Sequence, residues 1–144
     1  MGKKRIITES GVDTQALAEK SAQAVSSKKK LVEGVVAISA TYNNTMLVLT
    51  DRAGNAVLWS SSGALGFKGA KKGTPFAAGK VAEVLAEKAQ TLGLKEVDVV
   101  VKGVGAGRES AIRALAGKGL VINSIKDATP VPFNGPKPRK PRRV

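Results

Sequence analysis

The stretch VDVVVKGVGAGRESAIRALAGKGLVINSI, residues 97–125, decides the fold class of this chain. It begins with Val97–Val101, a run of β-branched residues that is typical of a strand. A glycine turn and the helical segment Arg108–Leu115 follow, and the next apolar run, Leu120–Ile125, predicts a second strand. Because strands joined through a helix favour parallel pairing, the stretch predicts a β-α-β unit.

The residues before this unit predict a meander of three strands and a longer helix. Turn signals rich in Asn, Asp and Gly separate three apolar runs, which are Val32–Thr41, Met46–Thr50 and Ala56–Ser61. Trp59 lies on the third run and is expected in the core. Apolar residues then recur at helical spacing, with Thr74 as the N-cap, Pro75 at the first helical position and Gly93 at the end. The expected fold is α/β, with a mixed five-stranded sheet in the order β-β-β-α-β-α-β, flanked by helices that cover its faces.

The composition limits the chemistry that this chain can perform. It has 144 residues, 24 Lys+Arg against 11 Asp+Glu, a net charge of +13, and no Cys or His. Without Cys it forms no disulfide, thiolate metal site or Cys nucleophile. Without His it has no Ser-His-Asp triad and almost no route to a zinc or haem site. Binding is therefore a better expectation than catalysis.

Charge and proline content predict three regions. Residues 31–129 are expected to form a globular α/β RNA-binding domain. Residues 1–30 form a basic N-terminal extension, in which Asp13–Val25 fits a short amphipathic helix or a mobile arm equally well. Residues 130–144 form a basic C-terminal arm that is rich in proline. Proline fixes φ and removes amide donors, so this arm is expected to be extended, with Lys and Arg projecting outward.

The net charge of +13 requires an anionic partner, either nucleic acid or the surface of an anionic membrane. No run of 18 apolar residues is present, so the sequence predicts no membrane-spanning helix. The first residues are basic, but no apolar stretch follows them as in a secretory signal. We therefore expect a cytoplasmic protein whose partner is nucleic acid.

The glycine turn Lys102–Glu109 lies where backbone amides and a helix dipole can hold phosphate. A dinucleotide-binding motif would begin at Gly103 and Gly105, but Arg108 stands at its third glycine position. Only one strand follows the helix, so no second nucleotide-binding half exists. We interpret the turn as presenting its amides, Arg108 and Arg113 to an RNA phosphate, with a packing role as the alternative.

A second glycine-rich segment, Gly63–Gly73, is also expected to contact RNA. Its lysines, Lys68, Lys71 and Lys72, are point charges suited to phosphate. Phe67 either stacks on an unpaired base or packs into the core. The alternative for the whole segment is a mobile surface loop.

The acidic residues form no active-site pattern. A nuclease with a related fold needs several clustered carboxylates to hold two metal ions. Asp51, Asp98 and Asp127 are single carboxylates whose spacing leaves such a cluster open, although the loops around them are rich in lysine. We expect no catalytic residue, no metal and no cofactor.

Several ordered motifs resemble the small-subunit ribosomal protein S-eleven family in its bacterial form. They run in register from about residue 34 to the last residue, and they are Tyr42–Thr45, Thr50–Asn55, Gly66–Gly69, Lys72–Ala78, Val101–Gly103, Gly105–Leu115, Asp127–Gly135 and Pro141–Val144. The resemblance implies a ribonuclease-H-like mixed sheet without catalytic residues. It also implies a place on the platform of the small ribosomal subunit, in the cytoplasm or in an organelle.

The resemblance implies a structural role in translation. The chain would bind small-subunit (16S-type) rRNA and help shape the mRNA exit-site cleft, beside proteins of the S-six, S-seven, S-eighteen and S-twenty-one families. No membrane and no small-molecule substrate is expected, and the alternative is a phosphate- or nucleotide-binding RNA-processing enzyme. From the motifs and the basic arm together, the predicted rRNA-binding residues are Asn43, Asn44, Thr45, Phe67, Lys68, Lys71, Lys72, Lys102, Gly103, Gly105, Arg108, Arg113, Thr129, Asn134, Lys137, Arg139, Lys140, Arg142 and Arg143.

Overall fold

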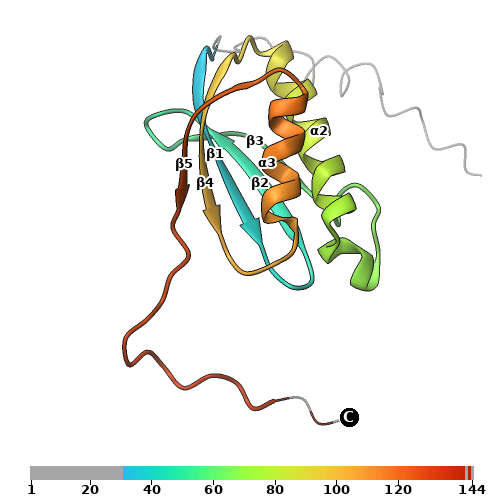
Figure 1. The fold of residues 1–144 in the computed structure, drawn as a ribbon, viewed down its shortest axis with the longest axis vertical. Coiled ribbons are helices and arrows are strands. Elements are labelled where there is room, and N and C mark those ends of the chain that lie inside the picture. Colours follow the sequence, from blue (N-terminus) through green and yellow to red (C-terminus); the bar gives the residue numbers. More distant parts are fainter. Residues whose placement is uncertain (1–30, 142, 144) are drawn as a thin grey trace, which may run out of the picture.

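The computed structural model describes residues 31–141 and 143, which fold around a five-stranded mixed sheet (Figure 1). The elements in chain order are β1 (Glu33–Ala40), β2 (Thr45–Thr50), β3 (Ala56–Ser61), the short 3-10 helix η1 (Gly69–Gly73), α2 (Pro75–Thr91), β4 (Glu96–Lys102), α3 (Gly107–Gly117) and β5 (Val121–Asp127). The predicted order β-β-β-α-β-α-β is confirmed, and η1 is an addition to it. The helix considered for Asp13–Val25 and the predicted site residue Arg142 lie outside the described residues.

The sheet has the strand order β3-β2-β1-β4-β5. β2 pairs antiparallel with β1 and β3, whereas β4 pairs parallel with β1 and β5. Four strands therefore end at the same edge of the sheet, and β2 begins there. The turn 41–44, the loop 62–74 and the segment 103–106 all lie at this edge, together with the first turns of α2 and α3 (Figure 1).

The helix α2 begins as its sequence predicts. The Thr74 hydroxyl accepts a hydrogen bond from the Ala77 amide at 3.3 Å, and Pro75 occupies the first helical position, where no amide donor is needed. Its buried residues follow helical spacing and include Val81, Ala82 and Leu85. This apolar stripe packs against the sheet and against α3.

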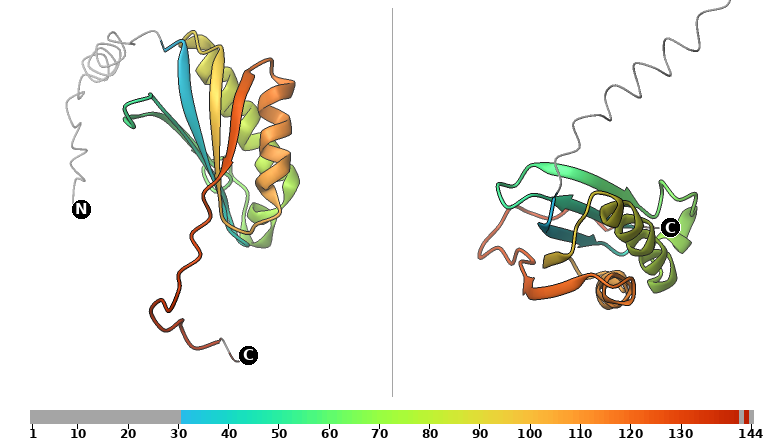
Figure 2. Two further views of the ribbon diagram at one scale, coloured as in Figure 1. Left: turned by 60° about the vertical axis from the view of Figure 1, so that its left-hand side comes forward. Right: turned by 90° about the horizontal axis from the view of Figure 1, so that it is seen from above.

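Only one face of the sheet is covered by helices. Both α2 and α3 lie on this face (Figure 2), and the strands alternate between buried and partly exposed side chains. Val36 and Ile38 of β1 face the helices and are 1% exposed, as are the alternate residues Val97 and Val99 of β4, at 1% or less. The expectation that helices cover both faces is therefore wrong. A sheet buried on both faces has continuous apolar strands, whereas these strands alternate in burial.

Trp59 is not a core residue, so that prediction is also wrong. Its side chain is 62% exposed on the face of the sheet that the helices leave open. The pairing of Leu58 with Leu49, and of Ser60 with Leu47, places those residues on the helix side. Because side chains alternate along a strand, Trp59 between them must point to the opposite face.

Candidate nucleic-acid interface

Most predicted site residues gather at the edge where four strands end. We define the loop edge as residues 41–44, 62–74 and 103–106 with the first turns of α2 and α3. These segments are far apart in sequence, but the parallel pairing of β1, β4 and β5 brings their connections to one end of the domain. The sheet topology therefore assembles a surface that no single motif contains.

The glycine turn is packed closely against the end of β1. A Cβ at Gly103 would overlap the Ala40 carbonyl oxygen, and one at Gly105 would overlap the Thr41 carbonyl oxygen. Both amides are engaged within the chain, since Gly105 donates to Ala40 at 2.8 Å and Gly103 donates to the Thr129 hydroxyl at 3.2 Å. These two glycines have the packing role considered as the alternative, and their amides do not face outward toward a phosphate.

Of the predicted contact residues in the turn 41–44 and at the start of β2, one is exposed to solvent. Asn43 is exposed, whereas the Asn44 side chain accepts a hydrogen bond from the Ser62 hydroxyl at 2.5 Å. Thr45 is completely buried, and its hydroxyl lies against Gly107 with no hydrogen-bond partner. Direct contact between RNA and the Thr45 side chain is therefore not consistent with this structure.

The loop 62–74 carries its cations at the surface. Lys68 and Lys71 are exposed, and Lys72 is half-buried with its aliphatic chain near Gly63. Lys102, at the end of β4, is also exposed. These ammonium groups add positive charge to the loop edge, and none of them has a salt bridge within the described part of the chain.

Phe67 is not buried in the core, and its stacking on an RNA base stays a prediction. It is half-buried and packs edge-to-face on Phe76, with the ring centroids 6.2 Å apart and the planes at 83°. Phe76 is the more exposed ring, at 67%, and Lys80 Nζ lies 5.9 Å from its centroid. Sequence reasoning missed Phe76. Its place outside the apolar stripe of α2 was the available signal, because an aromatic residue there must face solvent.

Arg108 holds the start of the C-terminal arm. Its guanidinium donates to the Asp127 carboxylate, to the Gly103 carbonyl and, at 3.2 Å, to the Thr129 hydroxyl. The Thr129 amide and hydroxyl in turn donate to the Asp127 carboxylate at 2.9 and 2.6 Å. We call Arg108, Asp127 and Thr129 the clamp. The Arg108 side chain is only 30% exposed, and both of its terminal nitrogens donate hydrogen bonds within the chain.

The clamp also changes the acidity of Asp127. Hydrogen bonds from Thr129, and then from Arg108, lower the pKa of the Asp127 carboxyl from 3.8 to about 2. Such bonds stabilise the charged form of a carboxylate. Asp127 is therefore ionised throughout the physiological pH range.

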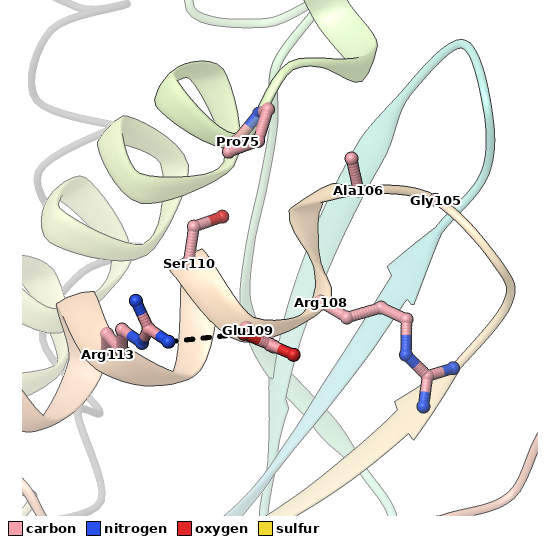
Figure 3. A pocket seen from close by; sticks show the side chains of 7 residues that line it. All are labelled: Pro75, Gly105, Ala106, Arg108, Glu109, Ser110 and Arg113. Carbon is pink, nitrogen blue, oxygen red and sulfur yellow. Dashed lines mark hydrogen bonds and ion pairs between the residues drawn. The ribbon is translucent and has the colours of Figure 1, made fainter.

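A shallow cavity of about 440 Å³ lies between the first turns of α2 and α3 (Figure 3). Its lining residues are Pro75, Gly105, Ala106, Arg108, Glu109, Ser110 and Arg113. Arg113 and Arg108 point to opposite sides in this view. Arg113 contacts Glu109 at 3.2 Å, but both side chains are 81% exposed, and such surface pairs are weak. Arg113 can therefore exchange this partner for a phosphate.

The C-terminal arm leaves the sheet at the loop edge (Figures 1 and 2). From Pro130 to Pro141 every residue is exposed and none lies in a helix or strand. Asn134 adopts a left-handed backbone conformation with φ of 54°. The exposed cations of the described part of the arm are Lys137, Arg139, Lys140 and Arg143.

The three aspartates considered for a metal site have separate partners. Asp51 accepts from Asn55 at 2.9 Å, Asp98 accepts from Ser124 at 2.7 Å, and Asp127 belongs to the clamp. Within residues 31–141 and 143, no three His, Cys, Asp or Glu side chains are grouped so that they could hold a metal ion. None of the helices described here is long and apolar enough to cross a membrane.

An α/β domain with cations on one edge and on an extended basic arm is typical of a nucleic-acid-binding protein. Residues 34–143 match the family described as Ribosomal protein S11, and the chain belongs to this family. The resemblance to the S-eleven family that the motifs indicate is thus confirmed.

Family membership decides between the two functions considered from the sequence. The chain is a ribosomal protein of the small subunit that binds rRNA and takes part in translation, and its partners are rRNA and ribosomal proteins. It is a structural protein and not an enzyme, so the alternative of an RNA-processing enzyme is wrong.

Proposed function

We propose that the loop edge and the C-terminal arm together bind small-subunit rRNA on the platform, beside the mRNA exit site. The observation that carries this proposal is the convergence of the loop 62–74, the cavity between α2 and α3, and the arm at one end of the domain. RNA-binding proteins obtain most of their affinity from cations that neutralise phosphates. In this proposal, residues 31–129 are the globular domain, residues 130–144 are the arm and residues 1–30 are an extension.

The cations of the two regions have different roles. Lys68, Lys71 and Lys72 of the loop edge, and Lys102 at the end of β4, act as point charges near the phosphate backbone. Arg113 at the cavity can bind a phosphate in a bidentate manner, as can the arginines of the arm. The remaining exposed contact residues of the proposal are Asn43 and Asn134.

The clamp contributes to RNA binding by fixing the position at which the arm leaves the domain. It joins the start of α3 to Thr129, the last residue before the prolines begin. A pre-extended arm with a fixed origin loses less conformational entropy when it lies along RNA. In this role Arg108 and Thr129 position the arm and do not themselves contact phosphate.

The protein neighbours on the platform belong to the proposal as well. We propose proteins of the S-six, S-seven, S-eighteen and S-twenty-one families, with the small subunit located in the cytoplasm or in an organelle. Membership of the Ribosomal protein S11 family supports these neighbours.

Charge reversal at the loop edge tests the RNA surface. Lys71→Glu with Lys72→Glu is expected to weaken binding to a small-subunit rRNA fragment by about tenfold or more in a filter-binding assay, because two phosphate contacts become repulsive. Lys88→Glu with Lys95→Glu makes the same change in charge at the opposite end of the domain. If both double variants lose affinity equally, only net charge matters and the proposed surface is wrong.

A further inference from the structure

The face of the sheet that α2 and α3 leave uncovered has exposed apolar side chains. We call it the open face (Figure 2). Trp59 is 62% exposed on it, and Met46 and Val57 are each 41% exposed. A group of large apolar side chains at the surface often marks a site of interaction with a partner.

The apolar side chains form a continuous row across the sheet. Trp59 pairs with Val48, Val48 pairs with Ala37, and Ala37 pairs with Val100. Val48, Ala37 and Val100 are half-buried, so their exposed atoms fill the gap between Trp59 on the edge strand and β4. The row therefore runs over four strands and is wide enough to take one packed element of a partner.

The charges of the open face distinguish it from the rest of the molecule. At the end where β1 and β4 begin lie Glu33, Glu96 and Asp98, and at the other end lie Lys102 and Lys126. Acids thus match or exceed cations here, although the whole chain has a net charge of +13. A nucleic-acid backbone avoids such a surface, because the carboxylates repel its phosphates.

Two of these carboxylates have no salt bridge in the described part of the chain. Glu96 accepts a hydrogen bond from Asn123 at 2.9 Å, and Asp98 accepts one from Ser124 at 2.7 Å. Glu33 differs, since Arg52 contacts it at 2.6 Å. The end of the row beside Asp98 and Glu96 therefore offers negative charge to an incoming group.

We infer that the open face is a docking surface for another protein. The partner presents apolar side chains to the row that begins at Trp59, and a basic side chain to Asp98 and Glu96. This arrangement buries the apolar surface and also matches charge, and charge complementarity gives an interface its specificity. The apolar row, Asp98 and Glu96 lie outside the loop edge, so docking there does not depend on the proposed RNA contacts.

The only Trp of the sequence makes the inference testable by spectroscopy. The full chain is labelled with 5-hydroxytryptophan, which can be excited apart from the ordinary tryptophan of other proteins. Quenching by acrylamide is compared for the free chain, its complex with rRNA and the assembled small subunit. We expect equal quenching in the first two states and severalfold weaker quenching in the subunit.

Each other outcome of this experiment overturns the inference. Shielding by rRNA alone would make the open face an RNA surface. Strong quenching in the subunit would show that the face stays in solvent. Shielding in the free chain would show that another part of this chain, or a second copy, already covers it.

A crosslinking experiment identifies the class of partner and tests the charge match. With p-benzoylphenylalanine in place of Val57, irradiated small subunits are expected to contain one protein–protein adduct. Asp98→Lys should reduce its yield severalfold, whereas Lys95→Glu, near the same end but outside the apolar row, should not. An adduct with rRNA, or with residues 1–30, contradicts the inference.

The inferred docking surface and the proposed RNA surface can be tested independently of each other. Trp59→Ser should lower the yield of the adduct while the affinity for the rRNA fragment stays unchanged, since Trp59 is exposed on the open face and lies outside the loop edge. Equal loss of both properties would contradict a separate docking surface. If only the Lys71→Glu, Lys72→Glu variant loses rRNA binding, this supports the proposed function. It does not change the result for the docking surface.

Discussion

At the scale of single residues, surroundings decide what a side chain does. From the sequence, Arg108 has the position and charge of a phosphate ligand, yet its guanidinium is engaged by Asp127, Thr129 and Gly103. Arg113, only five residues later, has a weak exposed partner and remains available. The two arginines lie on one helix but differ in role, because Arg108 reaches Asp127 at the end of β5 and Arg113 does not.

The pH dependence of stability tests the clamp. The folded chain keeps Asp127 ionised down to about pH 2, whereas an unfolded chain protonates it near its ordinary pKa of 3.8. The stabilisation by the clamp is therefore complete above about pH 4 and is lost as the pH falls from about 4 to 2. Urea unfolding at a series of pH values should show this loss as the difference between the wild type and Asp127→Asn.

The control for this prediction is Glu109→Gln, which removes an exposed carboxylate on the same helix as Arg108. Its difference from the wild type should be small at every pH, because its pair with Arg113 is open to solvent. If Asp127→Asn follows the wild type across the acidic range, the clamp does not stabilise the folded chain.

Gly103 is required by the close approach of two backbone segments. It has φ of 98°, and a Cβ there would overlap the Ala40 carbonyl oxygen. Gly103→Ala should therefore lower the free energy of unfolding by about 1–3 kcal/mol, as measured by urea denaturation.

Gly79 is the matched comparison, because it lies inside α2 and a Cβ there meets nothing within 4 Å. Gly79→Ala should raise the free energy of unfolding by ~0.5–1 kcal/mol, since Ala restricts the unfolded chain. A destabilising Gly79→Ala, or a neutral Gly103→Ala, would contradict this account of the two positions.

At the scale of elements, the start of α2 organises the loop edge. Thr74 joins η1 to α2, since its hydroxyl donates to the Lys71 carbonyl at 2.7 Å and accepts from the Ala77 amide. The same short segment thus caps the helix and holds the loop that carries Lys71. Thr74 therefore contributes both to the stability of α2 and to the position of the loop proposed to contact RNA.

Thr74→Ala should lower the free energy of unfolding by about 1 kcal/mol, because a helix amide loses its cap. Thr74→Ser retains the hydroxyl and should restore most of this loss, as measured by thermal unfolding of the two variants. Equal melting temperatures for the wild type and Thr74→Ala would show that the cap contributes nothing.

At the scale of the whole molecule, the positive charge is divided between a rigid edge and an extended arm. If roughly eight cations bind phosphates, log K for rRNA should fall against log salt with a slope of about −6 to −7. A nearly flat dependence would contradict electrostatic binding.

The contribution of the arm can be measured separately. Replacing Lys137, Arg139, Lys140 and Arg143 with Gln should reduce the magnitude of this slope by about 3, because about four counterions fewer are released. The folded domain should keep its unfolding free energy, since the arm lies outside the core. An unchanged slope would mean that the arm does not contact the RNA backbone.

The sequence by itself determined the elements, the mixed sheet and the class of partner. Alternation along β1, helical spacing in α2 and the cap Thr74 are local patterns, and each acts within a few residues of the chain. The absence of Cys and His and the charge of +13 are properties of composition, so they need no structure to be read.

Only the tertiary structure decided what the individual site residues do. The clamp joins positions 19–21 residues apart, and the row from Trp59 to Val100 joins four strands, so neither is visible in a local pattern. The physical reason is that a side chain's role depends on burial and on its partners. Both are set when the sheet brings distant segments to one edge and leaves one of its faces without helices.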